Sequence, residues 1–288
     1  MKILTKIVFT ILLAGLTLAG CTKLEEPYYT VKSVNGDTNM RAVILEDYTG
    51  HKCTNCAPAS RMAQNLQELY NGQVFVIAVH AGDFAEPDSV RYGGILKNNF
   101  ICQAGTDWFN YQPFKIDQNP KGMVNRLTFE GKQSFGKDDW AGAVSASVKK
   151  EKLAILTLNN NYNGSSKILT TTINSRYLQS IAGKVNLCVV ILEDSIYGGQ
   201  LNSVPGDSIP YYKHFRFMDV LRGAVNGSWG EQVSENPLKD ALISRTYTFD
   251  FSTQPLWVAS HCNVVAFLMN GETREIYHAT KKALTGSR

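Results

Sequence analysis

The sequence predicts an α+β protein of two domains, and two patterns carry this prediction. Residues 41–79 contain an apolar strand-like run, a segment with helical spacing and a second apolar run, which is the order of a βαβ unit with a parallel sheet. Beyond residue 150 the chain shows extended segments separated by turn-forming pairs such as Asn163-Gly164, a pattern typical of antiparallel β-structure. We therefore expect an α/β domain over residues 41–150, followed by an antiparallel β-sandwich over residues 151–288.

Each element of the α/β domain has its own signal. The apolar run at 41–48 predicts the first strand, and apolar positions three and four residues apart predict a helix over 57–70. The uninterrupted apolar run at 74–79 is typical of a parallel strand that is buried on both faces. After it, we expect an insertion at about 83–118 with a helix around 90–100, then a strand at 123–129 and a helix at 138–149.

The sandwich is predicted from alternating or continuous apolar runs of strand length. Its expected strands are 153–161, 167–176, 185–194, 246–251 and 262–270.

The composition is that of a globular protein. Of the 288 residues, 44% are hydrophobic and 19% are charged, and 29 basic against 25 acidic residues give a net charge of +4. Because the chain has no cluster of five basic residues, there is no electrostatic basis for a nucleic-acid partner. Six cysteines are too few to build a disulfide scaffold, so the core must come from ordinary burial.

The N-terminal residues have the features of an export signal. Lys2 and Lys6 precede an apolar run at 7–18, which is too short to span a bilayer as a helix. The following Ala-Gly-Cys, ending at Cys21, looks like a bacterial lipobox. We therefore expect residues 1–20 to be a lipoprotein signal peptide, Cys21 to carry the lipid that attaches the chain to a membrane, and residues 21–40 to be a tether.

Cys53 and Cys56 form a C-x-x-C pair between the first predicted strand and the first predicted helix. At a helix N-terminus, free backbone N–H groups favour a thiolate, so Cys53 is the expected nucleophile and Cys56 the resolving thiol if the pair is redox-active. A zinc site would need a second pair of ligands at similar spacing, whereas Cys102, Cys188 and Cys262 occur singly. We expect no metal and no cofactor, and His51 by itself is a weak indication of copper.

In this context the sequence resembles the thioredoxin-like superfamily, and the whole chain resembles the Omp28-related outer-membrane lipoproteins of Bacteroidetes. The stretches that carry the resemblance are residues 46–58, 119–126, Trp140 and 263–267. The resemblance implies a thioredoxin-like domain before the β-rich domain, and an outer-membrane location with the chain on the cell surface or the periplasmic face. It also implies that Pro120 is the cis-proline opposite the cysteine pair.

Asp47 stands six residues before Cys53, the offset at which thioredoxins carry a buried carboxylate that takes the proton of the resolving thiol. The alternative for Asp47 is a solvated acid at a strand end. The chain departs from the thioredoxin pattern in having no Trp before Cys53, Thr-Asn between the cysteines, and Ala57-Pro58 after them. Because of these departures, redox potential and activity do not transfer with the resemblance.

Two functions fit these features. In the first, Cys53 and Cys56 form a permanent disulfide in a lipoprotein that binds an envelope protein or ligand, or takes part in envelope assembly. In the second, the pair makes the chain a thiol–disulfide oxidoreductase. The bacterial envelope is oxidising, and a surface enzyme would lack an evident electron donor, which favours the first function.

Other residues are weaker candidates for a site. His80 is expected to pack at a strand end, and His214, Arg216 and Arg222 with Trp229 belong either to a ligand-facing loop or to a structural one. Three Asp-Ser-aliphatic triplets resemble the O-glycosylation acceptor of Bacteroidetes envelopes. Their serines are, in the order of expected modification, Ser208, Ser195 and Ser89.

Overall fold

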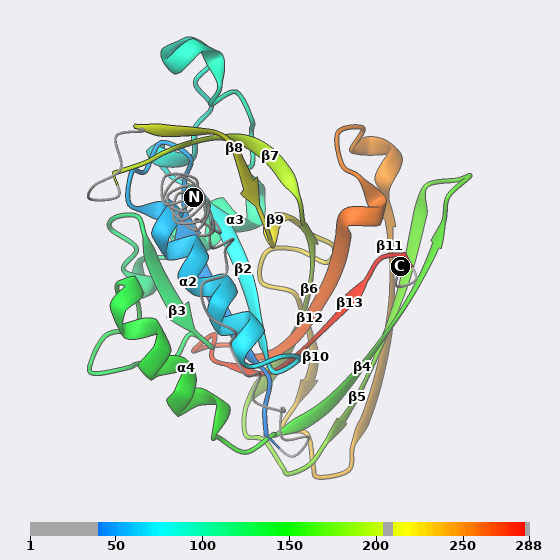
Figure 1. Ribbon diagram of the computed structural model, residues 1–288. Helices are drawn as coiled ribbons and strands as arrows, with labels where there is room; N and C mark the ends of the chain where they lie inside the picture. Colours follow the sequence, from blue (N-terminus) through cyan, green and yellow to red (C-terminus); the bar gives the residue numbers. More distant parts are fainter. Residues whose placement is uncertain (1–39, 204–209, 286–288) are drawn as a thin grey trace, which may run out of the picture. The chain divides into compact units, whose positions relative to one another are not determined.

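The computed structural model describes residues 40–203 and 210–285. The predicted signal peptide, Cys21, nearly all of the tether and Ser208 lie outside these residues. The described residues belong to one compact unit, which combines helices with three β-sheets (Figure 1). The predicted α+β class is therefore confirmed.

Strands from both halves of the sequence form the largest sheet in the described chain. Its hydrogen-bonded order is β13-β12-β6-β9-β2-β1-β3, and β10 pairs with β6 beside β9. The strands are β1 (Val43–Thr49), β2 (Val74–His80), β3 (Lys121–Val124), β6 (Lys184–Glu193), β9 (Val220–Ala224), β10 (Glu231–Glu235), β12 (Cys262–Asn270) and β13 (Ile276–Ala283). Because β9 pairs with β2 on one side and β6 on the other, main-chain hydrogen bonds join the segments before and after residue 150.

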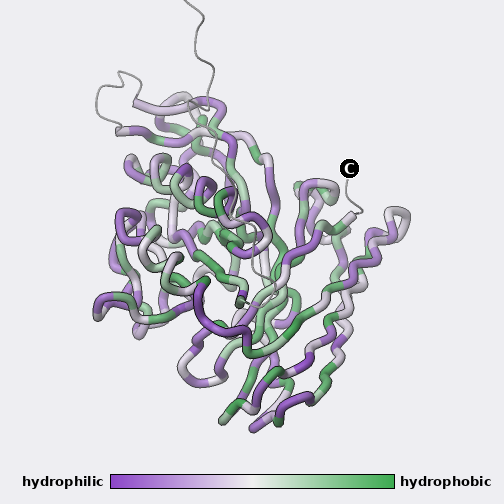
Figure 2. The backbone as a smooth tube through the Cα atoms, turned by 60° about the horizontal axis from the view of Figure 1, so that its bottom comes forward, coloured by the Kyte–Doolittle hydropathy of each residue, from purple (hydrophilic) through white to green (hydrophobic). Residues whose placement is uncertain are grey.

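Two smaller sheets complete the strands of the described chain. The three-stranded sheet has the order β11-β5-β4, and more and less buried residues alternate along β5 and β11. Hydrophobic and hydrophilic residues alternate along these strands in Figure 2. Its strands are β4 (Ala154–Asn163), β5 (Ile168–Tyr177) and β11 (Leu242–Asp250), while β7 (Ile196–Leu201) and β8 (Tyr211–Phe217) form a hairpin.

The helices cover the end of the large sheet that contains β1. Helix α2 (Cys56–Leu69) and helix α4 (Trp140–Val148) pack their apolar sides on one face of β1, β2 and β3. Helix α3 (Gln103–Phe109) packs on the opposite face, where alternate residues of β1, β2, β6 and β12 surround Trp108. The three-stranded sheet covers the remaining face of β6 and β12. Both faces of these strands are therefore buried, which explains their continuous apolar sequences.

The βαβ prediction is confirmed, because β1 and β2 pair in parallel with α2 between them in the chain. The helix predicted around 90–100 is wrong. Those residues contain only a short 3₁₀ turn at Arg91–Gly94, where Tyr92, Gly93 and Gly94 all have positive φ. Left-handed residues cannot continue a right-handed helix. The predicted strand at 123–129 is also shifted, since β3 ends at Val124 and the next two residues have positive φ.

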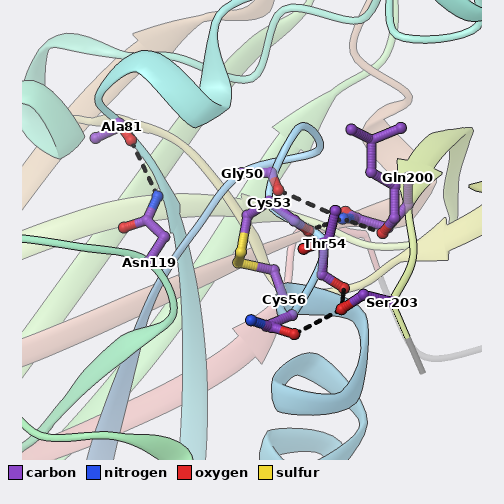
Figure 3. The surroundings of a disulfide bond; sticks show 10 residues. Gly50, Cys53, Thr54, Cys56, Ala81, Asn119, Gln200 and Ser203 are labelled. Carbon is purple, nitrogen blue, oxygen red and sulfur yellow. Dashed lines mark hydrogen bonds between the residues drawn. A yellow bond between two sulfur atoms is a disulfide. The ribbon is translucent and has the colours of Figure 1, made fainter. Parts of the chain in front are cut away.

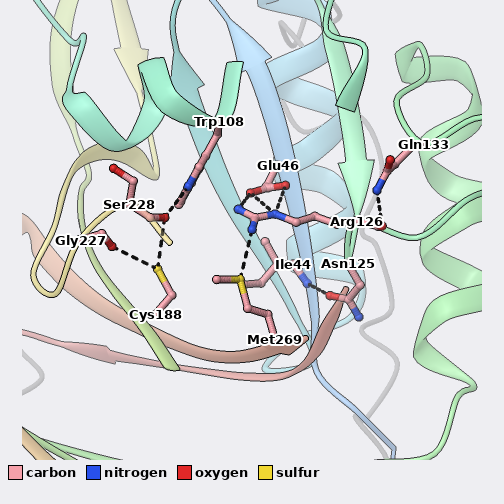
Figure 4. A network of polar contacts seen from close by, with 10 residues as sticks. All are labelled: Ile44, Glu46, Trp108, Asn125, Arg126, Gln133, Cys188, Gly227, Ser228 and Met269. Carbon is pink, nitrogen blue, oxygen red and sulfur yellow. Dashed lines mark hydrogen bonds and ion pairs between the residues drawn. The ribbon is translucent and has the colours of Figure 1, made fainter. Parts of the chain in front are cut away.

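A buried ion pair holds the centre of the fold together (Figure 4). Arg126 donates from Nη2 to Glu46 of β1 at 2.6 Å, and neither side chain has appreciable contact with solvent. The guanidinium also lies over the rings of Trp108 (4.7 Å) and Trp229 (5.6 Å). A buried charge needs a partner, so Glu46 and Arg126 depend on each other.

Candidate functional site

The Cys53–Cys56 disulfide lies where β1 leads into α2 (Figure 3). Strand β1 ends at Thr49, Asn55 precedes the helix, and Cys56 is its first residue. The two Cα atoms are 5.4 Å apart, a separation that suits a disulfide. The sequence thus placed the pair correctly at the start of the helix, while its role stays a prediction.

Both cysteines are buried, although the residues between them are exposed. Cys53 is 3% exposed and Cys56 is 1% exposed, whereas Thr54 and Asn55 face solvent. A thiol reagent or a substrate disulfide must reach a sulfur atom along its bond axis, so this burial limits exchange in the conformation observed.

The segment 200–203, at the end of β7, covers the disulfide loop (Figure 3). Gln200 donates from Nε2 to the carbonyl of Cys53 at 2.8 Å, and the N–H of Leu201 donates to the carbonyl of His51 at 2.9 Å. Ser203 donates from its N–H to the carbonyl of Thr54 at 3.1 Å. Sequence reasoning missed Gln200 and Ser203, because they come from the other half of the chain and belong to no motif.

Asp47 is fully buried in β1, paired with Ala78 of β2 and Gly122 of β3. Neither carboxylate oxygen has a hydrogen-bond partner among the described residues. Burial raises the pKa of this carboxyl from its ordinary value to about 8, because the charged form loses its hydration. Asp47 is therefore a protonated acid at neutral pH and not the solvated strand-end residue that was the alternative.

Pro120 follows a cis peptide bond with Asn119 and directly precedes β3. Because Lys121 pairs with Tyr48 near the end of β1, Pro120 lies at the same edge of the sheet as the segment that leads to Cys53. Asn119 donates from Nδ2 to the carbonyl of Ala81, the residue after β2, at 3.5 Å (Figure 3).

His51 and His80 pack into an aromatic cluster beside the disulfide loop. The His80 ring lies 4.8 Å from Phe100 and 5.6 Å from Phe217, and burial lowers its pKa to about 3. Burial also lowers the pKa of His51, which donates from Nε2 to the carbonyl of Glu86 at 2.9 Å. In residues 40–203 and 210–285, no three His, Cys, Asp or Glu side chains are grouped as metal ligands.

The single cysteines are small core residues. Cys188 and Cys262 are buried in β6 and β12, and burial raises the pKa of both thiols, that of Cys188 to about 12. Cys102 is half-buried, and burial raises its pKa as well. High pKa values make these thiols poor nucleophiles.

The segment predicted as one long loop around 214–230 contains strands β8 and β9 instead. His214 and Arg216 are exposed on β8, whereas Arg222 on β9 forms a buried ion pair with Glu193. Trp229 packs 5.0 Å from Tyr111. The structure therefore does not bring these four residues together as one site.

The two candidate glycosylation serines within the described chain differ in accessibility. Ser89 is exposed, whereas Ser195 is half-buried and accepts hydrogen bonds on Oγ from Arg216 Nε and Nη2 at 3.2 and 2.8 Å. In the part of the chain with described coordinates, no helix is long and apolar enough to cross a membrane.

Comparison with known proteins agrees with this architecture. The family model "Outer membrane protein Omp28" matches residues 109–287. The chain belongs to this family. Its location is therefore the outer membrane, as the resemblance implied. No functionally curated protein matches the sequence.

Two solved structures from Porphyromonas gingivalis are similar. HBP35 of this organism matches with a TM-score of 0.62 and 16% identity, covering 89% of this chain and 80% of its own, which is a similarity of fold. A domain of its outer membrane lipoprotein Omp28 matches with 26% identity and a TM-score of 0.31, covering 46% of this chain and 88% of its own.

Proposed function

We propose that this outer-membrane protein is a lipid-anchored binding or envelope-assembly protein in which the Cys53–Cys56 disulfide is structural. The observation that carries the proposal is the burial of both cysteines in a loop whose carbonyls accept hydrogen bonds from segment 200–203. A disulfide between buried cysteines, whose loop is fixed by hydrogen bonds to its carbonyls, is suited to holding a loop and not to exchanging with substrates.

The scaffold in this proposal is a thioredoxin-like domain at 41–150 and a β-sandwich at 151–288. The parallel β1–β2 pair, the helix that follows the cysteines and the strand that follows Pro120 support the first. The packing of the three-stranded sheet on β6 and β12 supports the second. The anchor is lipid on Cys21, and the chain faces either the cell surface or the periplasm.

The test is a comparison of disulfide reactivity in folded and unfolded protein. We expect a concentration of dithiothreitol that fully reduces the pair in 6 M urea to leave it intact in the native state, as measured by mass after alkylation. Gln200→Ala should accelerate native reduction at least tenfold, because it removes a bond to the Cys53 carbonyl. Gln179→Ala, which changes an amide far from the loop, is the matched control. Equal reduction rates in folded and unfolded protein would contradict a structural role.

A second function, thiol–disulfide oxidoreductase, is favoured by the buried carboxyl of Asp47. In this reaction the Cys53 thiolate attacks a substrate disulfide and releases one substrate thiolate. The Cys56 thiolate then attacks the mixed disulfide at Cys53 and releases the second. The substrate leaves as two thiolates, which take protons from water, and the pair is oxidised. Asp47 takes the proton of Cys56 in its carboxylate form, which a pKa of about 8 makes available only toward alkaline pH.

Trapping experiments test this second function. Cys56→Ser should accumulate mixed disulfides through Cys53 with envelope proteins in native cells, and Pro120→Thr should prolong them. Cells without such adducts would rule out the oxidoreductase. The reduction potential gives an independent answer, because structural disulfides have potentials below about −300 mV.

A further inference from the structure

A groove separate from the disulfide runs between the 99–104 segment, β9 and the 249–257 segment. It consists of two cavities of about 290 Å³ and about 400 Å³, which share Ile101, Arg222, Gln254 and Trp257 in their walls. Their size is that of sites that hold small molecules or a few residues of a peptide.

One wall of the groove is rigid and apolar. Trp257 stacks on Phe249 with ring planes 5° apart and centroids at 5.7 Å, and it meets Phe251 edge-on at 5.8 Å. The neighbouring N–H of Val258 donates to Glu193 Oε1 at 2.8 Å, which fixes this wall to β6. Leu256 stands at the rim and is 86% exposed.

Arg222 is the charged residue of the groove. Its Nε lies 3.2 Å from Glu193 Oε2, and the guanidinium lies 5.2 Å from the centroid of Trp257. Within the described chain, Nη1 and Nη2 of Arg222 make no hydrogen bond. Neither of these two atoms is fully buried. Two parallel N–H groups of an arginine are the geometry that binds a carboxylate through two hydrogen bonds.

The opposite wall offers free main-chain groups. Asn99, Phe100 and Ile101 line the smaller cavity and belong to no helix or strand. They make no main-chain hydrogen bond to another described residue, and the N–H of Ile101 donates instead to the Asn99 side chain at 3.0 Å. Unpaired main chain along a groove is suited to an extended peptide, which supplies complementary N–H and C=O groups.

We propose that this groove binds the C-terminal end of a polypeptide whose last residue is apolar. Arg222 binds the terminal carboxylate, the last side chain packs against Trp257 and Leu256, and the main chain of Asn99 and the carbonyl of Ile101 pair with the peptide backbone. This inference rests on the proposed binding function and names the class of partner. It involves no step at the disulfide.

The test uses two fluorescein-labelled peptides, Ser-Gly-Ser-Val-Phe with a free C-terminal carboxylate and the same peptide with a C-terminal amide. Fluorescence anisotropy with the disulfide-intact protein should show at least tenfold tighter binding of the free acid. Equal affinities, or no binding of the free acid, would overturn the proposal. A competition experiment with 3-phenylpropionate tests for a small-acid site. If this acid binds as tightly as the peptide does, the site takes a small acid and the peptide assignment is wrong.

Variants at two positions of the groove test the carboxylate contact and the apolar contact separately. Glu193→Gln/Arg222→Gln removes both charges of the ion pair and should abolish the preference for the acid, while Arg176→Gln, an exposed arginine elsewhere, should keep it. Leu256 lies at the exposed rim, where a substitution cannot disturb the core. Leu256→Glu should weaken binding of the free-acid peptide at least tenfold relative to Leu256→Gln. An unchanged preference in the Glu193→Gln/Arg222→Gln variant would refute the assignment of Arg222. Reduction of the disulfide is measured separately, so failure here and failure of the proposed function are distinct results.

Discussion

Replacing Asp47 by Asn should change the pH dependence of stability in a calculable way. The folded-state pKa of Asp47 is about 8, against an ordinary value of 3.8. Below pH 3.8 the carboxyl is protonated in both the folded and the unfolded state, so it adds no pH dependence to the free energy of unfolding. Between pH 3.8 and about 8 the unfolded chain ionises while the folded chain holds its proton, so stability falls as pH rises.

The slope is about 1.4 kcal/mol per pH unit for one proton. From pH 5 to pH 7, this gives a loss of about 3 kcal/mol from Asp47 alone. Asn cannot ionise, so Asp47→Asn should gain about 3 kcal/mol in unfolding free energy relative to the parent over that interval, whatever constant offset the buried amide brings.

Urea unfolding at pH 5, 6 and 7, with the disulfide intact, measures the difference. The chain carrying Cys21→Ser serves as the parent so that no lipid interferes. Asp83→Asn, at an exposed acid, is the matched control and should show no trend. A difference between Asp47→Asn and its parent that stays constant across these pH values would show that Asp47 ionises normally, and the argument from burial would fail.

Three further predictions follow from other parts of the molecule. Arg126→Met should destabilise the fold by about 3–5 kcal/mol in urea unfolding, because Glu46 keeps a buried charge without its partner. The double variant Arg126→Met/Glu46→Gln should recover most of the lost stability. A double variant as unstable as the single one would contradict this cause. Cys21→Ser should abolish acylation and release the chain from membranes, and retention after a carbonate wash would disprove the lipid anchor. Intact mass of protein from its own host should show a sugar increment at Ser208 before Ser195, and a mass equal to polypeptide plus lipid would rule out glycosylation.

Local pattern was sufficient where an element is defined by near neighbours in the chain. The β1–α2–β2 unit was predicted within one or two residues, because strand and helix periodicities differ and each run is strongly apolar. The helix predicted around 90–100 does not form, although its apolar spacing is helical, because Gly93 and Gly94 adopt a left-handed turn. Glycine's conformation depends on its surroundings, and sequence spacing does not report them.

The sequence by itself determined the α+β class, the position of Cys53 and Cys56 at the start of a helix, and the burial of β2. These features follow from short-range order and from apolar runs. Only the tertiary structure decided that Gln200 and Ser203 bind the main chain of the disulfide loop, that Asp47 is buried without a partner, and that Arg222 stands in a groove beside Trp257. Each of these depends on contacts between residues far apart in the chain. Arg222 reaches its place because β9 inserts between β2 and β6, a pairing that no local pattern specifies.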